Sequence, residues 1–185
     1  MKKRVVFMVI FLSIAAFTVI PKDSIKAGVF AGYFVPRDEI FKEVYGGGGD
    51  MIYGLKAGVR VWNGFFIWLS GSQYKKYSEM TFTSDITRLT LNPIDISLRY
   101  TAPLGRVNPF LGLGYTYLLF KERSAVGRID DEGAGLFVEA GLEFSLSSRF
   151  ILDVGAKYSQ IRVQPTDDEI DLGGLQAGVS FLVHF

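Results

Sequence analysis

Eight charged residues are spaced so that they could form ion pairs inside the folded chain. Two of them lie on each of four segments, four positions apart: Lys56 and Arg60, Asp95 and Arg99, Glu139 and Glu143, and Asp153 and Lys157. Side chains four positions apart on a β-strand point to the same face. Basic and acidic groups in equal number can neutralise one another away from water. The shared face and the balance of four basic against four acidic residues therefore predict a hydrogen-bonded, salt-bridged charge network.

The chain offers little for catalysis or for a cofactor. Its one histidine, His184, lies beside the C-terminus, and it has no cysteine, which excludes disulfides and thiolate metal sites. The serines near the predicted loops, Ser72, Ser78 and Ser84, have no histidine close to them in the sequence. A serine arrangement with Lys75, Lys76 or Asp85 remains open. We predict no catalytic residue, no cofactor and no metal site.

The charged residues lie in segments that alternate between apolar and polar side chains, as half-buried β-strands do. The spacing predicts eight strands, at 28–35, 51–62, 65–77, 86–101, 109–122, 134–145, 149–162 and 171–185. No segment after residue 27 shows helical periodicity. Each strand is about long enough to cross a bilayer when tilted. An all-β domain therefore follows.

The connections between the predicted strands alternate in length. Asn63-Gly64, Pro103–Gly105 and Leu146–Ser148 are short turns, and Asn-Gly strongly favours a two-residue hairpin. The other connections are longer and polar, at 36–50, 78–85, 123–133 and 163–170. Short turns on one side and longer loops on the other are typical of a membrane-spanning, up-and-down β-barrel. Both ends of the domain would then lie on the short-turn side.

The composition of the polar face indicates which face of the sheet points into the barrel. Beside the charged residues the polar face carries many glycines, among them Gly54, Gly58, Gly112 and Gly141. Glycine weakens a strand and serves no purpose on a solvated surface, whereas it fits a crowded interior. We therefore expect the charges inside and the apolar face toward lipid. A soluble barrel with the apolar face inward is the alternative.

Aromatic residues gather at the two ends of the predicted strands, where amphipathic rings would meet lipid headgroups. The short-turn end has Trp62, Phe65, Phe66, Tyr100, Phe144, Phe150 and Phe185, and the loop end has Tyr74, Tyr77, Tyr117, Phe120 and Tyr158. The last strand alternates apolar residues through Phe181 and Val183 to the terminal Phe185. Both features favour a membrane barrel.

The N-terminal segment, residues 1–27, is predicted to be a signal peptide. Lys2, Lys3 and Arg4 precede an uncharged apolar run, and Ala27 offers a small residue before a cut. The whole chain has 20 basic and 19 acidic residues, and residues 28–185 alone have a net charge of −3. No basic stripe remains for nucleic acid. Residues 28–185 would form one barrel domain.

The chain resembles the eight-stranded outer-membrane β-barrel superfamily that includes the OmpA transmembrane domain, OmpX and OmpW. The signal segment, the GGLQAGVSFLVHF ending and the patterns PFLGLGYTY and VEAGLEFSL carry this resemblance, which covers residues 28–185. It implies an all-β, eight-stranded antiparallel up-and-down barrel in the outer membrane of a Gram-negative bacterium. It also implies outer-membrane lipid and lipopolysaccharide as partners. The barrel assembly machinery would read Phe181, Val183 and Phe185.

Three functions follow as hypotheses. The first is a non-enzymatic, porin-like barrel for envelope structure, or for passive passage of small apolar molecules that exit sideways near Pro93. Pro93 lies within a predicted strand and cannot donate a ladder hydrogen bond. The alternative is a surface binding or adhesion protein that acts through its outer loops. Its acidic clusters, Asp130–Glu132 and Asp167–Asp171, could bind a divalent cation. A lipid-modifying barrel enzyme is the third.

Overall fold

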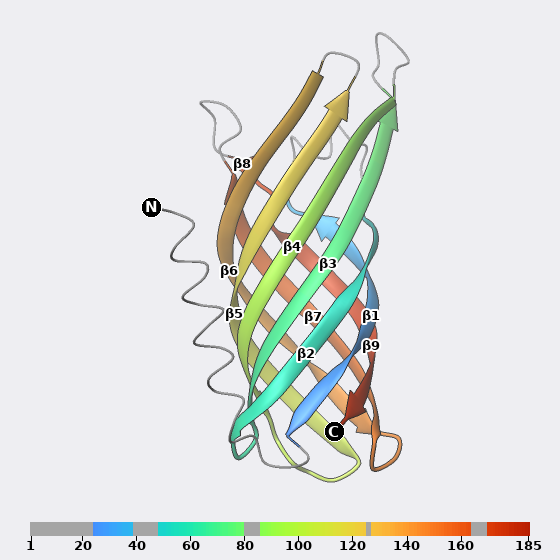
Figure 1. Ribbon diagram of the computed structural model, residues 1–185, viewed down its shortest axis with the longest axis vertical. Coiled ribbons are helices and arrows are strands. Elements are labelled where there is room, and N and C mark those ends of the chain that lie inside the picture. The colour runs from blue at the N-terminus through green and yellow to red at the C-terminus, as the bar shows by residue number, and fades with distance from the viewer. Residues whose placement is uncertain (1–23, 39–47, 80–85, 125–126, 164–169) are drawn as a thin grey trace.

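A computed structural model describes residues 24–38, 48–79, 86–124, 127–163 and 170–185, and it consists of antiparallel strands (Figure 1). The strands are β1 (Ile25–Pro36), β2 (Asp50–Trp62), β3 (Phe65–Glu79), β4 (Ile86–Thr101), β5 (Val107–Ser124), β6 (Gly127–Ser145), β7 (Phe150–Val163), β8 (Ile170–Asp171) and β9 (Gly174–His184). Among the residues described there is no helix long and apolar enough to span a membrane.

The sheet closes on itself. Each strand from β1 to β7 pairs with the next, β7 pairs with β8 and β9, and β9 pairs with β1. β8 and β9 are one crossing interrupted at Leu172 and Gly173, where the Asp171 carboxylate accepts hydrogen bonds from Ile161 N at 2.9 Å and Gly173 N at 2.8 Å. The predicted eight-stranded antiparallel barrel is therefore confirmed.

The turns follow local sequence chemistry. Trp62 and Phe65 are joined by Asn63-Gly64, with Gly64 at φ 75°, a left-handed conformation that glycine adopts without strain. One predicted loop is wrong. β5 runs to Ser124 and β6 starts at Gly127, so most of 123–133 extends the two strands. The polar residues and glycines of this segment are typical of a loop, but pairing between β5 and β6 keeps them in the sheet.

The apolar face of the barrel points outward. Leu55, Leu111 and Leu136 are 66 %, 65 % and 63 % exposed, although leucine is normally buried in water-soluble proteins. Side chains at alternate positions are buried in the lumen, as Arg99 and Glu143 are. Lipid is the solvent in which this arrangement is stable. The soluble-barrel alternative is thereby excluded.

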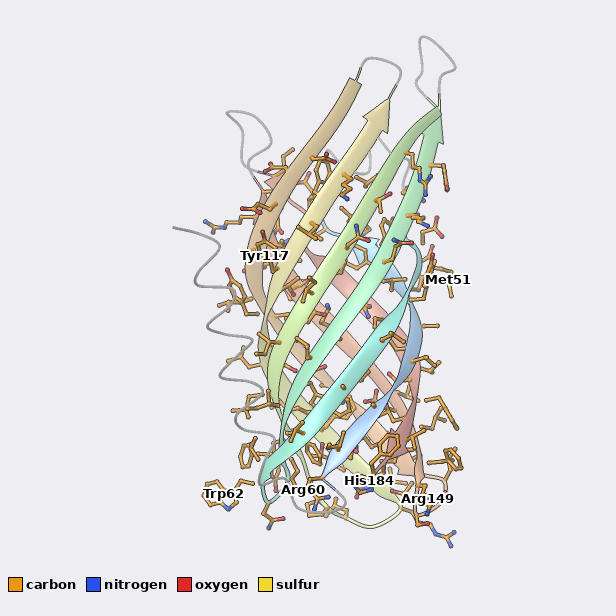
Figure 2. The ribbon with its side chains drawn as sticks, viewed as in Figure 1. Met51, Arg60, Trp62, Tyr117, Arg149 and His184 are labelled. Carbon is orange, nitrogen blue, oxygen red and sulfur yellow. The ribbon has the colours of Figure 1, made fainter. Side chains whose placement is uncertain are left out.

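Aromatic residues ring the outer surface at both ends. Trp62 lies at the short-turn end and Tyr117 much higher on the wall (Figure 2). The Trp62 ring stacks on Phe65, whose ring lies 4.9 Å from Tyr100. Three residues that the sequence pattern assigned to these rings, Phe66, Tyr74 and Phe120, are instead buried in the lumen. Their strand parity places them on the inner face.

Candidate functional site

The lower lumen, which is the half nearest the short turns, holds a network of charged side chains centred on Arg99 of β4. Its guanidinium is 2.6 Å from Glu139 Oε2 and 2.6 Å from Asp153 Oδ2, and it lies 3.7 Å from Glu143 Oε1. The Arg99 side chain is only 2 % exposed. Its planar group also stacks over Phe110, 3.9 Å from the ring centroid. One cation thus links acids from β6 and β7 across the barrel.

Two lysines join the network through carboxylates of other strands. Lys157 Nζ lies 2.7 Å from Asp95 Oδ2, and Lys56 Nζ lies 3.0 Å from Asp153 Oδ2. Hydroxyl groups donate to two further carboxylate oxygens: Thr116 to Asp95 Oδ1 at 2.6 Å, and Ser97 to Glu139 Oε1 at 2.9 Å. Glu143 Oε1 has no hydrogen-bond partner among the described residues. Buried carboxylates need several such partners, because burial without them is costly. The structure thus brings seven of the eight predicted charges together in the lumen.

Arg60 does not join this network. It lies at the short-turn mouth beside Trp62, exposed, with its guanidinium over the Phe66 ring at 5.5 Å (Figure 2). Including it among the interior charges was wrong, because four residues along a tilted strand carry the side chain from the sealed lumen to the rim.

Lys26 is the fourth cation of the network, a role that the sequence pattern assigned to Arg60. Lys26 was not predicted from the sequence. Its Nζ lies 2.5 Å from Glu143 Oε2, and its side chain is 7 % exposed. It was counted with residues 1–27 as part of the signal peptide. The alternation of β1 could have found it, because Lys26 shares the inward face with Gly28 and Phe30. With this exchange the network keeps four basic and four acidic groups.

Small residues make room for the network. A Cβ on Gly112 would lie 2.7 Å from Glu139 Oε1, and one on Gly58 would lie 2.5 Å from the Trp68 ring. The space left at the network is a cavity of about 70 Å³. That volume holds a few waters but no solute of metabolite size. The lower lumen therefore acts as a plug.

The upper lumen has the opposite chemistry. Ten buried side chains form an apolar cluster there: Phe34, Ile52, Tyr74, Leu89, Leu91, Leu118, Phe120, Ile161, Val163 and Leu172. A void of about 20 Å³ remains between the cluster and the network, and Pro93 lies on its wall. Going from the outer mouth inward, the lumen is first apolar and then densely charged.

The β3–β4 ladder is broken beside this void. Pairing stops after Gly71 and Ile94 and resumes at Tyr74 and Leu91, while Pro93 stays paired with β5. A proline has no N–H to donate to a neighbouring strand. The four intervening residues keep the same register without ladder pairs, so the defect is local.

Polar side chains replace the missing ladder bonds on the outer face. Gln73 Nε2 donates to Asn92 Oδ1 at 3.0 Å, and the Tyr53 hydroxyl donates to Gln73 Oε1 at 3.3 Å. An open groove of about 360 Å³ lies over this point, lined by Gly71 and Pro93 among others. Pro93 therefore borders both the inner void and the outer groove.

Other predicted residues lie elsewhere. Phe181 and Phe185 are exposed on the outer face at the short-turn end, and Val183 is half-buried in the β9 ladder. His184 lies at the same end (Figure 2), opposite Lys26 in the β1–β9 ladder. The cluster Asp130–Glu132 lies on β6. In the second acidic cluster, Asp167, Asp168 and Glu169 fall outside the described residues.

Comparison with known proteins agrees with this architecture. The family model described as "Outer membrane protein beta-barrel domain" matches residues 6–181. No curated protein sequence matches the chain.

Several solved structures share the fold. Neisserial surface protein A superposes with a TM-score of 0.70 at 18 % identity, covering 87 % of this chain and 97 % of that one. The outer membrane protein OprG of Pseudomonas aeruginosa gives 0.64 at 15 % identity, covering 90 % and 99 %. The N-terminal barrel of OprF from the same organism gives 0.59 at 13 %, covering 89 % and 98 %. At these identities the likeness shows the fold alone.

Proposed function

Because this chain belongs to the outer membrane protein β-barrel domain family and so resides in the bacterial outer membrane, we propose that it is a non-enzymatic route for small apolar molecules. Such a molecule enters the upper lumen from outside the cell. It leaves sideways into the membrane through the wall beside Pro93. The observation that carries this proposal is the broken β3–β4 ladder, with Pro93 bordering both the lumen void and the outer groove.

The sealed lower lumen supports a sideways rather than an axial exit. Arg99, Glu139 and Asp153 close the cross-section through short ion pairs. Separating them would expose charges to a low-dielectric interior, which is strongly unfavourable. An apolar solute gains nothing from contact with these charges. The membrane beside the wall is the favourable destination, because its hydrocarbon matches the solute.

The upper lumen offers a matching entrance. Its side chains are apolar, so they would exchange contacts with an apolar solute at little loss. The void is only about 20 Å³, so side chains such as Leu91 and Leu118 must move for passage. The opening at Gln73 and Asn92 is held by side-chain hydrogen bonds instead of the backbone ladder. Bonds of this kind separate more readily than a continuous ladder.

A disulfide across the break tests this route. The chain has no cysteine, so Gln73→Cys with Asn92→Cys introduces one pair at directly opposed positions. The matched control is Leu69→Cys with Ile96→Cys, an opposed pair on the same outward face inside the intact ladder. We expect oxidation to lower uptake of radiolabelled dodecane by cells carrying the first pair. Reductant should restore it, and the control pair should have no effect.

Replacement of Pro93 by valine is the second test. Valine supplies the missing N–H, so the β3–β4 ladder can close and dodecane uptake should fall. Unchanged uptake both in Pro93→Val and in the oxidised double variant (Gln73→Cys with Asn92→Cys) would refute the lateral route. A purely structural role in the envelope would then remain.

A surface binding or adhesion role is the alternative. It depends on the outer loops, much of which lie outside the described residues: 39–47, 80–85, 125–126 and 164–169. Binding of outer-membrane lipid, lipopolysaccharide and the assembly machinery are further proposals. The outward apolar band, which lies between two belts of aromatic residues around the barrel, supports the lipid contact.

A further inference from the structure

Three successive inward positions of β3 end in hydrogen-bond donors. They are Ser72, Tyr74 and Lys76, which alternate with the outward Gln73 and Lys75. Residues two apart on a strand are separated by about 6.6 Å, so the donors form a row along the upper lumen. The row runs from the outer mouth at Lys76 to the ladder break beside Ser72.

Two of these donors are buried without a partner. Tyr74 is 0 % exposed, and neither its hydroxyl nor Ser72 Oγ has a hydrogen-bond partner in the described part of the chain. Tyr74 lies among apolar side chains, with its ring against Phe34 in an edge-on contact at 5.3 Å. Buried hydroxyls in native proteins are almost always satisfied, so an unpaired one calls for an explanation. A ligand atom that accepts a hydrogen bond provides one.

Lys76 is only loosely held at the outer end of the row. Its Nζ lies 3.5 Å from Gly49 O and 4.0 Å from Asp50 Oδ2, and the Asp50 side chain is 46 % exposed. By contrast, the lysines of the lower network are held at 2.5 to 3.0 Å by buried carboxylates. Lys76 can therefore exchange its contacts for those of an anionic group.

We propose that this row recognises the head of a single-chain carboxylate amphiphile, such as a medium-chain fatty acid. The inference rests on the proposed lateral route and names the substrate class for it. Lys76 attracts the carboxylate at the mouth, Tyr74 and Ser72 then donate to it in turn, and the alkyl chain lies among the apolar cluster. Gln73 and Asn92 meet the head at the opening in the wall.

The chemistry of the row favours a carboxylate over other heads. An ionised carboxylate is compact and only accepts hydrogen bonds, which matches a row of donors. An ammonium head would be repelled by Lys76 and could not accept from Tyr74. A hydrocarbon without a head passes through the same apolar cluster but leaves both hydroxyls unpaired.

Uptake of two solutes of equal chain length tests the proposal. Cells without a fatty-acid channel of their own would express the full chain and receive radiolabelled dodecanoate or dodecane. We expect Tyr74→Phe to lower dodecanoate uptake about tenfold, because a hydrogen bond to a charged acceptor is worth a factor of that order. Dodecane uptake should not change. The control is Tyr115→Phe, which alters an outward tyrosine on β5.

A second pair of variants protects the test against misfolding. Lys76→Met should lower dodecanoate uptake selectively, whereas Lys75→Met, its outward neighbour, should not. Equal effects on both solutes, or dodecane uptake without dodecanoate uptake in the unaltered protein, would overturn the carboxylate proposal and leave the lateral route standing. Uptake of neither solute by the unaltered protein would overturn both.

Discussion

At the scale of single residues, the contribution of a charged side chain to stability depends on its position in the barrel. Arg99 and Arg60 are both arginines on the inward face, yet one holds two buried acids and the other lies exposed over Phe66. Removing one member of a buried ion pair leaves the other charge buried and unpaired. When an exposed charged group is removed, water solvates its former neighbours, so the loss of stability is small.

We therefore predict that Arg99→Ala lowers the free energy of unfolding by about 3–5 kcal/mol. Glu139→Ala should also be destabilising, because Arg99 would lose one of its two closest carboxylates. Arg60→Ala should change the free energy by less than about 1 kcal/mol. Urea titration of the refolded protein in detergent micelles measures all three. Equal effects of Arg99→Ala and Arg60→Ala would mean that the lumen at Arg99 is hydrated.

Tyr74 presents the opposite case, a buried group whose removal should help stability. Its hydroxyl is unpaired, so Tyr74→Phe should raise the free energy of unfolding by about 1 kcal/mol. Tyr33 is the matched control, because its hydroxyl donates to Gly49 O at 2.8 Å. Tyr33→Phe should lower stability by a similar amount. A loss of stability in both variants, by the same titration, would contradict an unpaired Tyr74 hydroxyl.

At the scale of the strand, alternation in the sequence was enough to predict most of the barrel. The predicted strands at 51–62 and 86–101 match β2 and β4 closely, because period-2 alternation and turn residues act locally. Long-range facts were out of reach. Neither the partner of Glu143 nor the depth of Arg60 depends on neighbouring residues, since both follow from tilt and register across the closed sheet. A defect in the ladder at Pro93 could be expected from the sequence, because proline has no N–H to donate whatever its neighbours are.

The outward face of a strand can be tested with a single lysine. Val138 is 49 % exposed on β6, where we expect mid-bilayer lipid. Val138→Lys should lower stability by roughly 2–4 kcal/mol, and Val107→Lys, beside a short turn, by at most about 1 kcal/mol. Unfolding in lipid vesicles measures the difference. A negligible loss at Val138 would place that position outside the hydrocarbon.

The start of β1 bears on where the signal peptide ends. A cut after Ala27 remains the prediction from sequence, yet Ile25–Ala27 pair with β2 and Lys26 binds Glu143. A refolded chain that starts at Gly28 should therefore be less stable than one that starts at Ser24, by roughly 3 kcal/mol. Mass measurement of the exported protein then identifies which of the two forms the cell makes. Equal stability would mean that Arg99 alone satisfies Glu143.

At the scale of the whole molecule, the lumen is divided into two parts. The lower part is filled by the salt-bridged network, and the upper part is filled by the apolar cluster, beside which the β3–β4 ladder is interrupted. β3 to β6 rise above the other strands on the side that carries the break (Figure 1). Closure of the sheet gives each of the eight crossings a neighbour on both sides, so no edge of the sheet faces lipid.

That closure depends on the last strand, which joins β1 on one side and β7 on the other. A chain ending at Ser180 loses Leu182, which is fully buried, and four ladder pairs from Val29–Phe181 to Lys26–His184. We expect it to lose the fast-running band that an unboiled, closed barrel gives on a gel. Phe185→Ala removes only an exposed ring beyond the ladder, so its refolded band should remain while its level in the outer membrane falls. A normal level in cells would mean that the assembly machinery does not read Phe185, and a heat-modifiable band from the shortened chain would mean that β9 does not close the barrel.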